Sequence, residues 1–285
     1  MLCGALLVGA CVTDADVSNP PDSPAALIAT TSIWADIASN VLCGEVVPAL
    51  LPTGADPHTF EPSLRDRELL EDASVVIANG AGLEESLADL LDTVQGSGSG
   101  VVDMTDQIDL MNGDPHIWQD PTLVAATLDA LADAAATSGA ELATVTACAA
   151  RYRSELNALD IEIAALIDSV PPENRVMVTS HDSLGYFADR YGLEIVGTVI
   201  PSTNTLAQTS AADLAALADA ITERNVPAVF TEQLESTNDA QALAERLGVR
   251  IVPLVTDALT GDGPGDSYIG MMRSNATAIA EALAP

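Results

Sequence analysis

The sequence predicts an α/β fold of two lobes, each a mostly parallel sheet flanked by helices, joined by one long rigid helix. Short apolar runs alternate with segments of helical spacing along most of the chain, and this alternation is typical of parallel sheets. It stops once, at residues 143–170, where neither Gly nor Pro occurs and apolar residues recur on one helical face. Pro171 and Pro172 end this segment, and the alternation resumes. The alternative is a single continuous α/β domain, which the uninterrupted helix disfavours.

The first lobe, residues 25–142, begins the alternation. We expect Ser32 to cap its first helix, because a hydroxyl there accepts a hydrogen bond from a free backbone N–H. Asp120 followed by Pro121 is a strong start for its last helix. GSGSG at residues 96–100 predicts a surface loop. The expected strands are Ala26–Thr31, Val46–Leu51, Val75–Ala78 and Val101–Met104, and the expected helices are Ile33–Leu42, Ser63–Asp72, Leu83–Leu91 and Pro121–Ser138.

The second lobe, residues 171–285, follows the linking helix at residues 143–170. At 1.5 Å per residue that helix would be about 42 Å long, far longer than its neighbours. The expected strands of the lobe are Val176–Thr179, Ile195–Ile200, Ala228–Thr231 and Ile251–Val255, and its expected helices are Leu184–Arg190, Ser210–Arg224, Asp239–Leu247 and Ser267–Leu283.

The chain opens with a short apolar run at residues 1–11, which resembles the end of a secretory signal peptide. The string LLVGAC is similar to a bacterial lipobox, in which Cys11 would be lipidated. No Lys or Arg precedes the run, so either the true start lies upstream or the similarity is accidental. Residues 12–24 are expected to form a flexible tether. We therefore expect an exported protein, either a lipoprotein anchored to the cell membrane or a periplasmic one.

Two further cysteines, Cys43 and Cys148, remain once Cys3 and Cys11 are assigned to the leader. Disulfides persist in exported proteins, so these two are candidates for a bridge. The alternative is a pair of buried free thiols, because Cys is often simply buried.

The charge of the chain is strongly one-sided, with 10 basic and 42 acidic residues and a net charge of −32. Nucleic-acid binding needs a basic surface, so we exclude it, and we disfavour direct docking on an anionic membrane. The acidic surface either keeps the protein soluble or concentrates cations around it.

The three histidines, His58, His116 and His181, each follow an expected strand and lie within two residues of an aspartate. Asp257 follows another strand in the same way. Because ligands of open α/β sheets bind beyond the carboxyl ends of the strands, these side chains can converge between the lobes. Three imidazoles and a carboxylate suit tetrahedral Zn²⁺, and the carboxylate adds tolerance for Mn²⁺. Taken singly, each histidine is better explained as a surface or structural residue.

A histidine that binds a metal usually donates its second ring N–H to a carboxylate or a carbonyl. The acidic residues close enough in sequence to do this are Asp56, Glu61, Asp114, Asp120 and Asp182. Trp118 and Tyr186 either line the cleft or belong to the core, as most buried aromatic residues do.

Several strings resemble, in the right order, the zinc and manganese solute-binding proteins of bacterial ABC importers, known as cluster A-I. These strings are GADPHTFEPS, DPHIWQDP, SHDSLGYFADRYGL, FTEQLES and VTDALTGDGPGDSYIGMMRSNATAI. The resemblance covers about Ala26 to Leu283 and implies two lobes, a rigid linking helix and a metal between the lobes. It also implies that Glu232 lies near the cleft, either close to the metal ligands or at a lobe contact, unless it is only an acid at a helix entry. The ligands that it implies are His58, His116, His181 and Asp257.

Histidine at position 181 resembles the zinc-type members, because manganese-type members carry a glutamate there. Many zinc-type members also carry a long His-rich loop, whereas Asp109–Asp114 is short and contains no histidine. The short loop weakens the case for extra low-affinity zinc capture and leaves the metal open, with Zn²⁺ expected from the histidine at position 181 and Mn²⁺ as the alternative.

The resemblance implies a monomeric binding protein that captures Zn²⁺ outside the cytoplasmic membrane and delivers it to the permease of an ABC importer. A zinc-dependent hydrolase, with Glu232 as general base, is an alternative of a different class, but the chain contains no HExxH motif. A surface adhesin is a third interpretation, which no feature of the sequence selects.

Overall fold

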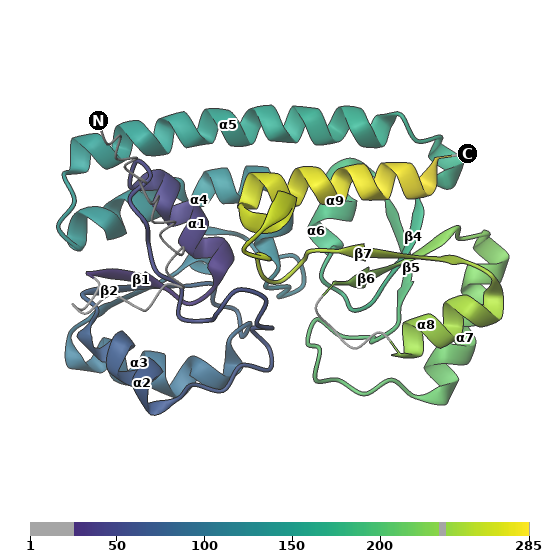
Figure 1. Ribbon diagram of the computed structural model, residues 1–285, viewed down its shortest axis with the longest axis horizontal. Coiled ribbons are helices and arrows are strands. Elements are labelled where there is room, and N and C mark those ends of the chain that lie inside the picture. The colour runs from purple at the N-terminus through teal and green to yellow at the C-terminus, as the bar shows by residue number, and fades with distance from the viewer. Residues whose placement is uncertain (1–25, 234–237, 285) are drawn as a thin grey trace, which may run out of the picture.

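The computed structural model describes residues 26–233 and 238–284, which form two α/β lobes with one long helix running along the top of both (Figure 1). The strands are β1 (Leu27–Ala29), β2 (Val75–Ala78) and β3 (Gly100–Asp103) in the first lobe, and β4 (Val176–Thr179), β5 (Glu194–Thr198), β6 (Ala228–Glu232) and β7 (Arg250–Leu254) in the second. The sheet orders are β1-β2-β3 and β5-β4-β6-β7, and every strand pair is parallel. The expected fold class is confirmed.

The helices cover the sheets on both faces. In the first lobe they are α1 (Ser32–Val41), α2 (Leu64–Asp72), α3 (Ala88–Ser97) and α4 (Pro121–Thr137). The linking helix is α5 (Leu142–Asp168), and the second lobe contains α6 (Gly185–Tyr191), α7 (Ala211–Arg224), α8 (Asn238–Leu247) and α9 (Tyr268–Leu283).

The linking helix α5 has 27 residues, which makes it about 40 Å long. Its start is fixed by Glu141, whose carboxylate accepts hydrogen bonds from the backbone N–H groups of Ala143 and Thr144. It ends before Pro171 and Pro172, which cannot continue a helix. The helix packs against α1 and α4 of the first lobe and against α6 and α9 of the second.

One apolar core extends through both lobes beneath α5 (Figure 1). Helices of the first lobe, the linking helix and helices of the second lobe all contribute fully buried side chains to it. Smaller clusters fill the opposite faces of the sheets, under α2 and α3 in one lobe and under α7 and α8 in the other. Representative members of the shared core are Trp34, Leu128, Leu156, Ile163, Phe187 and Ile279.

The expected strand at Val46–Leu51 is wrong. This segment makes only an isolated bridge, between Ala49 and Ala29 of β1. Pro48 lies in the middle of the run and has no N–H to donate to a ladder, and Val46 is 83% exposed. The first sheet therefore has three strands among the described residues.

Two other local expectations are also wrong. Thr31, and not Ser32, caps α1, because the Thr31 hydroxyl accepts a hydrogen bond from Trp34 N. The helix expected at Leu83–Leu91 is a short 3₁₀ turn followed by α3, which runs into the glycine-rich string and ends at Gly98 with φ of 112°.

The expected signal sequence at residues 1–11, Cys11 and the tether at residues 12–24 lie outside the described residues. Within the described part of the chain, no helix combines the length and apolar character needed to cross a bilayer.

A disulfide joins Cys43, just after α1, to Cys148 in α5, with 5.4 Å between their Cα atoms. It closes a loop with a sequence separation of 105 residues and ties the first lobe to the start of the linking helix. In the chain-entropy model a loop of this length stabilises the folded state by about 4–5 kcal/mol.

Reduction should therefore lower the denaturant midpoint of unfolding by an amount that corresponds to about 4–5 kcal/mol. Urea titrations with and without reductant measure this shift. In the double variant Cys43→Ser, Cys148→Ser the reductant should have no effect. Equal midpoints for the oxidised and reduced wild-type chains would contradict the expectation.

Candidate metal centre

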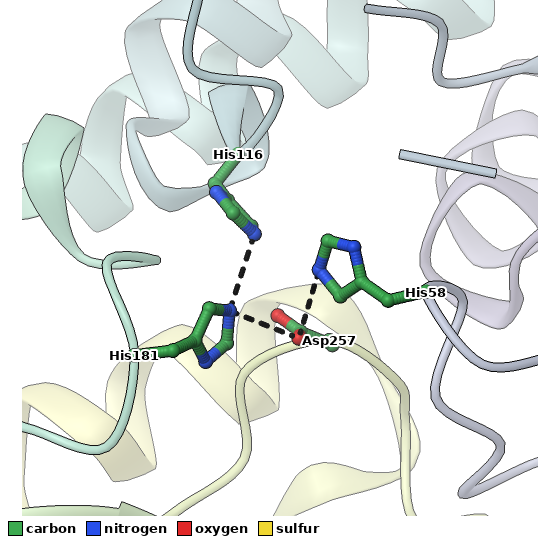
Figure 2. A group of neighbouring side chains, drawn as sticks. All are labelled: His58, His116, His181 and Asp257. Atoms are coloured by element: carbon green, nitrogen blue, oxygen red, sulfur yellow. Dashed lines mark hydrogen bonds and ion pairs between the residues drawn. The ribbon is translucent and has the colours of Figure 1, made fainter. Parts of the chain in front are cut away.

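The four side chains expected to form a metal site meet between the lobes (Figure 2). Each residue offers one ligand atom, and these four atoms all lie within 4.8 Å of one another. All four residues are buried, with exposures between 0% and 6%. The four residues lie in four separate loops, two in each lobe. They are His58, His116, His181 and Asp257.

The spacing of the donor atoms suits a small ion. His181 Nε2 lies 3.4 Å from His116 Nε2 and 3.5 Å from Asp257 Oδ2. His58 Nε2 lies 3.8 Å from Asp257 Oδ2. A tetrahedral ion with bonds of about 2.0–2.1 Å separates its donors by about 3.3–3.4 Å. The three closest pairs nearly match these separations, and donors that lie further apart, within a limit of 4.8 Å, would have to move closer for all four to reach one central ion.

The sheets place the second-lobe donors directly. His181 follows β4 and Asp257 follows β7, at the carboxyl edge of the sheet, as parallel sheets predict. In the first lobe, His116 comes well after β3, and His58 follows no strand, because the segment before it is not part of the sheet. The first-lobe donors therefore depend on loop contacts for their positions.

Two of the imidazoles are oriented by buried carboxylates. His116 Nδ1 lies 2.6 Å from Asp114 Oδ1, which also accepts a hydrogen bond from the His116 backbone N–H. His181 Nδ1 contacts Glu232 Oε1, and the Ser180 hydroxyl donates to the same oxygen. These contacts fix the rings so that their Nε2 atoms face the centre of the cluster.

His58 is held differently. Its backbone N–H donates to Asp56 Oδ1, and the other oxygen of Asp56 accepts a hydrogen bond from Thr205 in the second lobe, at 2.8 Å. Its ring Nδ1 has no hydrogen-bond partner within the described ranges. His58 is thus the histidine with the least side-chain support.

The remaining acidic residues named from the sequence lie further out. Glu61 is exposed to solvent. Asp182 is half-buried, and its pKa is raised above the usual value, chiefly by burial and further by the charge of Asp114. Asp120 caps α4 by accepting from Thr122 N, as the sequence predicts. Of the acidic residues expected to support the ligands, Asp114 and Glu232 contact a histidine ring, whereas no such contact is found for Glu61 or Asp182 within the described part of the chain.

Burial keeps two of the imidazoles, those of His58 and His116, neutral. Burial, with a smaller effect from the neighbouring His116, lowers the pKa of His58 to about 3. Burial also holds the pKa of His116 well below its usual value of 6.5. Neutral imidazoles offer the lone pairs that a metal ion requires, so these rings need not lose a proton before binding.

Burial acts in the opposite direction on the supporting carboxyls. It raises the pKa of Asp114 to about 6. It raises the pKa of Glu232 to about 8, with a further contribution from the charge of Asp56. A cation at the centre of the cluster would favour the ionised form of both carboxyls, because opposite charges attract most strongly where water is excluded.

A buried polar network also holds the His116 segment from within the first lobe. Asn79, at the end of β2, donates its side-chain amide to Pro115 O at 2.9 Å and accepts from Trp34 Nε1 at 2.8 Å. Glu84 accepts from Asn79 N and from the Thr30 hydroxyl. Sequence reasoning missed this network, although Asn79 directly follows β2, much as His181 and Asp257 follow β4 and β7.

Hydrogen bonds cross between the lobes close to the cluster. Trp118 Nε1 donates to Thr256 O at 2.8 Å, which links the residues next to His116 and Asp257. Tyr268 donates its hydroxyl to Trp118 O at 2.7 Å. Trp118 is therefore both a core side chain and a lobe contact.

Comparison with known proteins agrees with this geometry. Residues 27–282 match the family described as zinc-uptake complex component A, periplasmic. The zinc-binding protein TroA of Treponema pallidum is 29% identical over 282 residues, which cover 92% of this chain and 90% of TroA. Its solved structure superposes with a TM-score of 0.84, covering 92% of this chain and 100% of the other.

Two relatives are named for manganese instead of zinc. The manganese-binding lipoprotein MntA of Halalkalibacterium halodurans is 31% identical over 285 residues, or 95% of this chain and 92% of MntA. The manganese ABC transporter substrate-binding lipoprotein PsaA of Streptococcus mitis is 25% identical over 278 residues, or 90% and 89% of the two chains.

A buried cluster of three histidines and an aspartate, set between two lobes on a linking helix, is the architecture of the solute-binding proteins of ABC metal importers. This chain is such a protein. Within that class it belongs to the family of zinc-uptake complex component A.

The Glu84 carboxyl supplies a test of the network that holds the His116 segment. Burial raises its pKa above the usual value of 4.5, so the folded chain keeps a proton that the unfolded chain releases. The stabilisation that the protonated Glu84 carboxyl contributes is fully present below pH 4.5. It is lost as the pH rises through the raised pKa of the folded state. Glu84→Gln should flatten the decline of the urea midpoint with pH in the metal-free protein.

The matched control is Glu85→Gln, which removes an acidic charge from the neighbouring exposed position. Parallel pH profiles for the wild-type chain and Glu84→Gln would show that the buried carboxyl does not contribute in this way.

Proposed function

We propose that this protein captures Zn²⁺ outside the cytoplasmic membrane and delivers it to the permease of an ABC importer. The observation that carries the proposal is the buried group of three imidazoles and one carboxylate, with donor atoms within 4.8 Å of one another. An ion at their centre could receive a lone pair from each of the four side chains.

The donor set favours Zn²⁺. Imidazole nitrogen is a ligand that Zn²⁺ accepts readily in a tetrahedral site, whereas Mn²⁺ prefers oxygen donors and higher coordination numbers. The name of TroA, a relative 29% identical, also points to zinc. Mn²⁺ remains the alternative cargo, because a relative 31% identical is named for manganese.

The geometry favours a metal-binding protein over a metal-dependent enzyme. Four protein donors complete a tetrahedron, whereas catalytic zinc keeps an open position for water. The carboxyl that a hydrolase would use as general base, Glu232, is engaged with His181 Nδ1 and the Ser180 hydroxyl. Glu232 is therefore assigned to orienting a ligand.

The partner of the protein is the membrane permease of the importer, and we propose that the protein reaches it as a monomer. Lipidated Cys11 would hold it at the membrane surface, or the chain would move freely in a periplasm. A strongly acidic chain of net charge −32 does not suit nucleic acid as a partner.

Offered Zn²⁺ and Mn²⁺ together, the purified chain should retain one Zn²⁺, as read by native mass spectrometry and calorimetry. Asp257→Asn should weaken Zn²⁺ binding by more than about 100-fold, because losing a ligand costs more than losing a residue that orients one. All three histidines lie in the cluster, so every imidazole NMR signal should shift when the metal binds.

The control is Asp262→Asn, an exposed aspartate in the same loop, which should bind as the wild-type chain does. Retention of Mn²⁺ in preference to Zn²⁺ would keep the import role and change the cargo. A chain that holds neither ion would overturn the proposed function.

A further inference from the structure

The turn that precedes His116 is held by a side chain from the other lobe. The hydroxyl of Tyr186, in α6, accepts a hydrogen bond from Met111 N at 3.0 Å and donates one to Asp114 O at 2.9 Å. Met111 and Asp114 are the two ends of one turn, closed by a hydrogen bond from Asp114 N to Met111 O. Tyr186 is 6% exposed, so water competes little for these bonds. One hydroxyl therefore fixes both ends of the turn.

Asp114 passes this constraint to the metal centre. Its Oδ1 accepts from His116 N and lies 2.6 Å from His116 Nδ1. The same ring points its Nε2 toward His181 Nε2, 3.4 Å away. Any movement of the turn would therefore be transmitted to the donor atom of His116.

The turn packs closely against Gly185 at the start of α6. A Cβ atom placed on Gly185 would lie 3.0 Å from Asp114 Oδ2 and 3.1 Å from Met111 Cε. Gly185 and Tyr186 open α6, which follows the loop of His181 along the chain. The start of α6 thus connects a ligand of the second lobe to the turn that orients a ligand of the first.

We propose that Tyr186 is a positioning residue, whose hydroxyl fixes the His116 turn relative to His181 and thereby slows release of the bound ion. The inference rests on the proposed function of metal capture. Without the hydroxyl, a backbone N–H and a carbonyl lose their partner and the turn relaxes. His116 then leaves the ion more often, although all four ligands are still present.

The test uses Tyr186→Phe, which removes one hydroxyl and keeps the ring. The control is Tyr191→Phe in the same helix, whose hydroxyl donates to Asp160 of α5 at 3.1 Å. The release rate is measured by mixing the Zn²⁺-loaded chain with an excess of a chromogenic chelator. Tyr186→Phe should speed release by about three- to tenfold, less than the 10- to 100-fold typical of a residue that touches the ligand directly. Tyr191→Phe should release at the wild-type rate.

Two further readouts separate positioning from general destabilisation. The melting temperatures of the two metal-free variants should be similar, and only Tyr186→Phe should shift the imidazole NMR signal of His116. Gly185→Ala, which pushes on the same turn while keeping the hydroxyl, should also speed release. Equal release rates for Tyr186→Phe and Tyr191→Phe would overturn the inference. A wild-type chain that retains no Zn²⁺ would overturn the proposed function itself, and this inference with it.

Discussion

The continuous apolar core beneath α5 fixes how far apart the two sheets lie, and the metal centre depends on that separation. Fully burying a large apolar side chain contributes about 1.5–3 kcal/mol. Exposing four such residues by rotating the lobes apart would therefore cost about 6–12 kcal/mol, which is comparable with the whole stability of a typical domain. The hydrogen bonds from Trp118 and Tyr268 across the lobe boundary add to this cost. We therefore expect the ion to exchange through loop movement, with the lobes held in place.

The electrostatics of the centre follow from the same burial. The core excludes water from the imidazoles, which lowers the pKa of His58 and His116 and leaves them neutral. The supporting carboxyls of Asp114 and Glu232 have raised pKa values for the same reason. A divalent cation reverses this cost, because it binds the lone pairs and favours the ionised carboxyls around them. The chain carries a net charge of −32, which we expect either to keep the protein soluble or to concentrate cations around it.

Much of this arrangement could be predicted from the sequence. Strand–helix alternation and a long segment without Gly or Pro give the two lobes and α5, and post-strand positions point to His181 and Asp257. Pro48 misled the strand assignment, because the apolar pattern around it continues while its missing N–H prevents a ladder. The support of the site could not be predicted. Asn79, Trp118 and Tyr186 act through hydrogen bonds to backbone atoms far away in the sequence, and such contacts leave no local pattern.

The most direct test of the central claim is the distance between the lobes with and without metal. Spin labels at Asp72→Cys in α2 and Glu245→Cys in α8 occupy exposed positions in the two lobes, and the distance is measured by pulsed electron paramagnetic resonance. Cys3 and Cys11 are replaced by serine, and the disulfide between Cys43 and Cys148 is kept. A shared core predicts the same distance distribution before and after Zn²⁺ is added. A shift of several ångström on binding would contradict it, and would show that the lobes rotate against each other to admit the ion.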